Sequence, residues 1–208
     1  MSKLIRLIWI GSLPLSFVTA GAGMLWLSTT LDPGVDFYQR LINHRDAWVG
    51  SHIVLMISAI LLIPAAIALW TAVEGRRGTT LAGIGMLLAI PATVFLAGQY
   101  AIDFVMPLVA AAGEPAYPVH KALFSTAHIK TMFYGVPDLG PLGLLLMSVA
   151  LALSGSQRPA TLVALAVLWI GVIGGNILQQ PLVARSCLLL LGFAYIPVAR
   201  HLMKATSD

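Results

Sequence analysis

The chain has 208 residues, of which 59% are hydrophobic and 10% charged, and its mean hydropathy is +0.91. Soluble domains carry about 25% charged residues, so a chain this apolar cannot cover itself with polar surface in water. A lipid bilayer is the solvent that fits, because each helix there satisfies its own backbone hydrogen bonds. The net charge of +4 comes without a basic run interleaved with aromatic residues, so we expect no nucleic-acid partner.

Apolar segments of membrane-spanning length recur along the whole chain. A spanning helix needs about 20 mostly apolar residues. Six segments meet this requirement and predict an all-α integral membrane protein with a single domain over residues 1–208. The first span begins near Lys3 and Arg6 and contains Ala20-Gly21-Ala22, as a secretory signal does, but its apolar run continues through Trp26, so we expect a retained helix. The predicted spans cover residues 5–31, 48–73, 80–102, 132–153, 160–178 and 182–202.

Basic residues predict the orientation, because Lys and Arg accumulate in cytoplasmic loops. If both termini are cytoplasmic, seven of the twelve Lys and Arg residues lie on the inner side. We therefore expect a multi-pass protein of the inner (plasma) membrane with two long outer loops, residues 32–47 and 104–131. The seven inner basic residues are Lys3, Arg6, Arg76, Arg77, Arg158, Arg200 and Lys204.

The two outer loops differ in their patterns. In the first, apolar residues at helical spacing predict a short amphipathic helix: Val35, Tyr38, Leu41 and Ile42. In the second, three prolines predict a turn or extended middle: Pro107, Pro115 and Pro118.

Two histidine pairs suggest a weak internal repeat. His44 and His52 are eight residues apart, as are His120 and His128, and an apolar span follows each pair. Helices two and three would then match helices four and five as a parallel repeat about an axis along the membrane normal. Chance similarity between apolar segments is the alternative.

Polar residues gather near the outer ends of the predicted spans, whereas the inner halves are nearly all apolar. Ionisable groups at membrane depth usually face a bundle interior or a wet cavity, so the pattern predicts a polar pocket that opens outward. Solvation in the headgroup zone is the alternative. Gly135, Pro137 and Gly140 surround Asp138 and are expected to loosen its helix. The predicted pocket residues are Gln99, Tyr100, Asp103, Lys130, Asp138, Asn176 and Gln179.

The histidines suggest a cofactor site. Two imidazoles on facing helices can hold a haem b between them, and His52 with His128 is the natural pair because they occupy equivalent places in the repeat. The layout of six helices with histidines on helices two and four is similar to the cytochrome b561 type. That resemblance implies haem-based electron transport, but the family has a second ligand pair on helices three and five, where this chain has no histidine.

Another metal is the competing cofactor. His44, His120 and Asp46 would supply nitrogen and oxygen ligands that zinc, iron or copper accepts, together with His52, His128 and Asp36. No tight spacing such as H-x3-H is present. The simpler interpretation is that these are interfacial histidines that bond to loop carbonyls or water.

Three classes of function stay open from the sequence. The first is a redox or ligand-binding membrane protein that uses the outer pocket, and whether it is an enzyme is undecided. The second is a small-solute or proton-coupled transporter. The third is a non-catalytic subunit of a larger membrane complex or a homo-oligomer, for which close-packing glycines such as Gly21, Gly85 and Gly175 are suited.

Overall fold

The computed structural model describes residues 3–73, 75–155 and 157–204, and this part of the chain is almost entirely helical. Six helical segments are long and apolar enough to cross a membrane, which confirms an all-α, multi-pass membrane protein in a lipid environment. Three of the basic residues that predict the orientation, Lys3, Arg6 and Arg77, have side chains that the structure does not describe. The segments cover Leu7–Ser28, Arg45–Thr71, Gly78–Ala111, Ala127–Ser154, Pro159–Ile177 and Pro181–Lys204.

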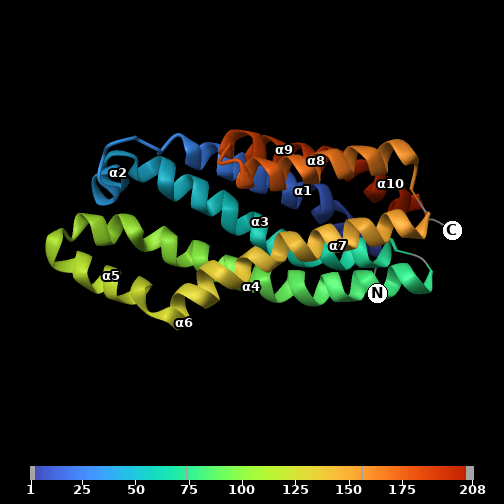
Figure 1. Ribbon diagram of the computed structural model, residues 1–208, viewed down its shortest axis with the longest axis horizontal. Coiled ribbons are helices and arrows are strands. Elements are labelled where there is room, and N and C mark those ends of the chain that lie inside the picture. Colours follow the sequence, from blue (N-terminus) through green and yellow to red (C-terminus); the bar gives the residue numbers. More distant parts are fainter. Residues whose placement is uncertain (1–2, 74, 156, 205–208) are drawn as a thin grey trace.

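The helices run along one long axis, and both ends of the described chain lie at the same end of the bundle (Figure 1). We call this the terminal end, and the opposite end, which carries α2 and α5, the loop end. The assignment of the terminal end to the cytoplasm rests on the basic residues and stays a prediction. The spans are built from α1 (Lys3–Ser28), α3 (Arg45–Thr71), α4 (Arg76–Ala111), α7 (Leu139–Ser154), α8 (Pro159–Ile177), α9 (Pro181–Ala194) and α10 (Ile196–Lys204).

The first long loop contains the predicted amphipathic helix, α2 (Phe37–Asn43). The side chain of Asp36 caps it by accepting hydrogen bonds from the backbone N–H groups of Tyr38 and Gln39. Tyr38 and Leu41 are buried, as the spacing predicts, whereas Ile42 is exposed.

The second long loop is mostly helical, and the predicted turn is confined to a short stretch over residues 112–116. Helix α4 continues through Pro107 and ends at Ala111, two residues before Gly113, whose φ of 79° favours glycine. A short turn, η1 (Glu114–Ala116), then leads into α5 (Tyr117–Ser125) and α6 (Ala127–Lys130). Pro115 and Pro118 lie in first turns, where the missing N–H has no helical partner to lose.

The fourth span begins irregularly. Between α6 and α7 lie a π-helical turn, η2 (Thr131–Gly135), and a 3-10 turn, η3 (Val136–Asp138). The glycines and proline near Asp138 loosen the helix here, as expected. Single π-helical turns are frequent at functional sites, because they reposition side chains relative to a regular helix.

Spans that are consecutive in the sequence pack closely, except α7 and α8. Helix α1 packs against α3 and α9, α4 packs against α3 and α7, and α8 packs against α9. Consecutive helices α3 and α4 form a close hairpin, but α7 and α8 touch at few positions. The predicted repeat therefore stays a prediction, and its two units differ in how their helices pack.

Glycines allow the closest helix contacts. A Cβ atom on Gly85 of α4 would lie 2.6 Å from the carbonyl oxygen of Gly143 on α7, and one on Gly143 would lie 2.5 Å from that of Gly85. Real Cβ atoms do not approach so closely. Only hydrogen at these two positions lets α4 and α7 pack with their backbones in contact, as small residues do in membranes.

A buried polar network joins α7, α8 and the C-cap of α9. The Ser148 hydroxyl donates to the carbonyl oxygen of Leu144, 2.8 Å away, so its oxygen is left to accept. It accepts from Trp169 Nε1 at 3.1 Å and from the Tyr195 hydroxyl at 2.5 Å. Phe17 of α1 stacks on the Tyr195 ring with centroids 4.8 Å apart. One serine thus satisfies two buried donors from other helices.

Ser148→Ala is predicted to destabilise the bundle, because it removes the acceptor of the Tyr195 hydroxyl and leaves Trp169 Nε1 only its longer contact of 3.4 Å to the Tyr195 oxygen. The expected loss is about 1–3 kcal/mol in the free energy of unfolding, measured by denaturation in mixed micelles. Ser12→Ala is the matched control, since the buried Ser12 hydroxyl bonds only to Trp9 in its own helix. Equal losses in the two variants would contradict the network's role.

Candidate functional site

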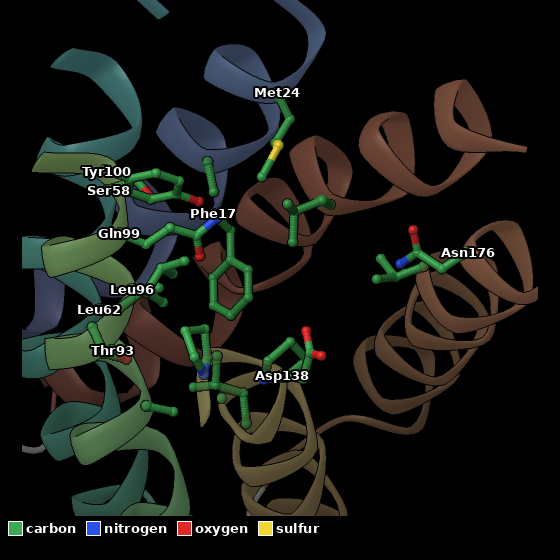
Figure 2. A pocket seen from close by; sticks show the side chains of 18 of the residues that line it. Phe17, Met24, Ser58, Leu62, Thr93, Leu96, Gln99, Tyr100, Asp138 and Asn176 are labelled. Atoms are coloured by element: carbon green, nitrogen blue, oxygen red, sulfur yellow. The ribbon is translucent and has the colours of Figure 1, made fainter. Parts of the chain in front are cut away.

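A cavity of about 340 Å³ opens between α7 and α8, in the half of the bundle toward the loop end. All six spans contribute to its wall. Figure 2 shows Gln99 and Tyr100 on one wall and Asn176 on the facing wall, with Asp138 between them. The volume lies at the lower end of the range for small-molecule pockets, which is about 300–1,000 Å³.

The cavity is mainly apolar, with a few polar groups that converge on it. Phe17, Leu62 and Val172 belong to its apolar surface, and Ser58, Thr93 and Gln99 supply polar atoms. Asp138 and Asn176 are exposed at the rim, whereas Tyr100 is buried in the back wall. Asp138 occupies the N-cap position of α7 but makes no capping bond, so its carboxylate is left to face the opening.

The lining of the cavity carries a negative charge and no positive one. Asp138 is its single ionisable carboxylate, and no Lys, Arg or His contributes to it. A carboxylate beside aromatic rings such as Phe17 and Trp169 favours a cationic group, through both charge and cation–π attraction. An anionic solute would meet a like charge at the rim and find no compensating base.

The cavity is closed on the side of the terminal end. Trp169 is 2% exposed and lines the cavity while its Nε1 bonds to Ser148. Ser148 lies ten positions beyond Asp138 along the chain, which corresponds to about 15 Å along a helix. The Ser148 network therefore forms the floor of the cavity.

A second polar centre, the Asp103 cluster, lies one helical turn from the cavity wall and consists of His52, Asp103 and Tyr134. The Tyr134 hydroxyl donates to Asp103 Oδ1 at 3.0 Å, and His52 Nε2 lies 3.9 Å from Asp103 Oδ2. Gln99 also hydrogen-bonds to this carboxylate and lines the cavity, so it connects the two centres. The π-helical turn η2 supplies Tyr134 to the cluster.

The hydrogen bonds of His52 fix its tautomer. Nδ1 lies 2.7 Å from the carbonyl oxygen of Trp48, which can only accept, so Nδ1 carries a proton. In the neutral ring, Nε2 then presents a lone pair toward Asp103 Oδ2. That contact is repulsive with an ionised carboxylate and attractive once either group gains a proton. At 3.9 Å the two groups are too far apart for a hydrogen bond, so they interact through charge alone.

At the loop end, aromatic side chains from α2 and α5 cover this cluster. The Tyr38 hydroxyl and His120 Nδ1 are 2.7 Å apart, and Tyr38 stacks on Tyr117 with ring centroids 3.6 Å apart. Burial lowers the pKa of His120 from its ordinary value, and the charge of Asp103 opposes this effect. A neutral His120 can accept the Tyr38 O–H at Nδ1, which joins α2 to α5.

The structure does not bring the predicted haem ligands into a common site. His52 is 2% exposed, stacks on Trp48 at 4.5 Å between centroids, and has both ring nitrogens engaged. His128 is exposed on the short helix α6. The cavity is lined by neither histidine. The predicted haem site between these two imidazoles therefore stays a prediction.

The predicted metal ligands are also dispersed. His44 Nε2 donates to Asp32 at 2.9 Å, His120 faces Tyr38, and Asp46 is exposed. Within residues 3–73, 75–155 and 157–204, no three His, Cys, Asp or Glu side chains form a group that could hold a metal ion.

Four of the seven predicted pocket residues line the cavity together: Gln99, Tyr100, Asp138 and Asn176. Asp103 lies behind Gln99, whereas Lys130 and Gln179 are exposed and do not line it. Phe17, Trp169 and Tyr134 were not anticipated as site residues. In the sequence, the first two resemble any other apolar residue of a span. Tyr134 could have been identified because it lies next to the helix irregularity that Gly135 and Pro137 indicate.

Comparison of the chain with models of known protein families, with curated proteins and with solved structures finds no match.

Proposed function

We propose that this chain is a membrane protein that binds small amphipathic solutes in the cavity between α7 and α8, with cations and neutral molecules favoured over anions. The observation that carries the proposal is the lining of the cavity. It joins apolar surface from all six spans to one rim carboxylate and several uncharged polar groups, without a basic residue. An apolar body would lie on Phe17 and Trp169, and a polar or cationic head would face Asp138 and Asn176.

The preference for charge can be tested with three probes of similar size. Benzyltrimethylammonium, benzyl alcohol and phenylacetate carry a positive, zero and negative charge on the same aromatic body. Trp169 lines the cavity, so binding to the detergent-solubilised protein is measured by tryptophan fluorescence and by thermal shift. We expect the cation to bind most tightly and phenylacetate to bind least.

Asp138→Asn is predicted to weaken binding of benzyltrimethylammonium about twofold to fivefold, since a charge pair at an exposed rim contributes about 0.4–1 kcal/mol. Benzyl alcohol should bind as before. Asp46→Asn is the matched control, because Asp46 is an exposed acid outside the cavity. Gly140→Leu should fill the cavity and weaken both probes. Equal affinity for phenylacetate and the cation, or undiminished binding in Gly140→Leu, would refute the proposal.

The Asp103 cluster supports a second candidate, a proton-coupled carrier for such solutes. Gln99 lines the cavity and contacts the Asp103 carboxylate, so a bound cation and a proton on the Asp103 cluster would compete electrostatically. The other titratable groups that face this pair are Tyr100, Tyr134 and His120.

Competition between the bound cation and a proton on the Asp103 cluster predicts that benzyltrimethylammonium binds more tightly as the pH rises. In Asp103→Asn this dependence should flatten, while binding of benzyl alcohol stays unchanged. The affinities are measured by fluorescence titration at each pH. A pH dependence as steep in Asp103→Asn as in the unmodified protein would eliminate the coupling.

A further inference from the structure

A basic pocket of about 440 Å³ lies at the terminal end, between the start of α8 and α10. It is far from the cavity along the bundle, since α8 begins and α10 ends where both chain ends lie (Figure 1). Its lining holds four basic residues and no acid: Arg158, Arg200, His201 and Lys204, together with Gln157, Thr161 and Pro197. In the described part of the chain, none of these four basic side chains forms an ion pair.

Helix dipoles account for only part of this charge. Arg200, His201 and Lys204 lie near the C-terminus of α10, where cations are favourable. Arg158 is the N-cap residue of α8, at the positive end of a helix of 19 residues, where another positive charge is unfavourable. No side chain caps this helix. An anion in the pocket would stabilise the Arg158 charge and interact favourably with the positive end of the helix dipole.

Gln157 supplies an independent indication of a ligand. Its amide Nε2 atom is buried and has no hydrogen-bond partner among the residues that the structure describes, although Gln157 lines the pocket. A buried donor without an acceptor is costly, and native structures rarely keep one without a reason. Arg158 and Arg200 also line the pocket, but their guanidinium groups can only donate hydrogen bonds. They therefore cannot accept one from the Gln157 amide. An oxygen-rich anion would provide the acceptor.

We propose that this pocket binds a phosphate-bearing anionic group. Phosphate oxygens accept from guanidinium groups in a bidentate manner, and basic pockets between membrane helices bind the headgroups of anionic lipids. The group can belong to a lipid of the adjacent leaflet or to a soluble phosphate compound. Both sources present the same chemistry to Arg158, Arg200 and Gln157.

The test uses the full chain in a neutral detergent and measures thermal stabilisation. The added probes are phosphatidylglycerol, phosphatidylcholine, inorganic phosphate and glycerol 1-phosphate. Stabilisation by phosphatidylglycerol alone assigns the site to a lipid headgroup, and equal stabilisation by glycerol 1-phosphate assigns it to soluble phosphates. Absence of a shift with every phosphate probe, or an equal shift with zwitterionic phosphatidylcholine, would overturn the proposal.

Variants locate the binding in the pocket. Arg158→Gln and Arg200→Gln should each weaken the apparent affinity about fivefold, the effect of one basic residue near an anionic surface. Arg76→Gln is the matched control, because Arg76 lies at the same end but outside the pocket. Gln157→Leu changes no charge and should also weaken binding severalfold without lowering the stability of the free protein. Equal losses in Arg76→Gln, or unchanged binding in Gln157→Leu, would show that the effect is only interfacial charge.

Discussion

The hydrogen bonds that Ser148 accepts from Trp169 and Tyr195 determine how α7 and α8 stand relative to each other. In a bundle surrounded by lipid, helix packing gains little from the hydrophobic effect, because the alternative contact is also apolar. A buried polar network with every donor satisfied therefore carries more of the specificity of packing than it would in water. The network joins the two helices at one level, and the cavity lies between them on the side toward the loop end.

The two polar centres of the molecule follow from the same constraint. A polar side chain within a span must find a partner or line a space, and the structure contains both solutions side by side. Asp103 is paired with His52 and Tyr134 behind the wall, whereas Asp138 and Asn176 face the opening. Gln99 lines the cavity and contacts Asp103, so we expect a solute in the cavity to act on this cluster through Gln99.

The six spans and four of the polar residues that line the cavity could be predicted because they depend on local features, namely apolar length and polar groups at the outer ends of spans. The glycines and proline around Asp138 likewise predicted the irregular start of the fourth span. The extent of α4 could not be predicted, because Pro107 is a strong helix-breaking signal in water and is tolerated where neighbouring helices pack against it. The Ser148 network was missed because its members are single polar residues far apart in sequence. The pairing of His52 with His128 rested on the repeat, but the structure places Asp103, not His128, beside His52.

We propose that the cavity opens between α7 and α8 on the outer side and binds a solute there. The most direct measurement is thiol labelling on intact cells with a membrane-impermeant maleimide, in a Cys187→Ala background that removes the single cysteine. Asn176→Cys places the thiol at the rim, and Leu165→Cys places one at a position that is 2% exposed and outside the cavity lining. We expect rapid labelling at position 176, which benzyltrimethylammonium should slow, and no labelling at position 165. Labelling at position 176 only after permeabilisation, or labelling that the cation leaves unchanged, would contradict this proposal.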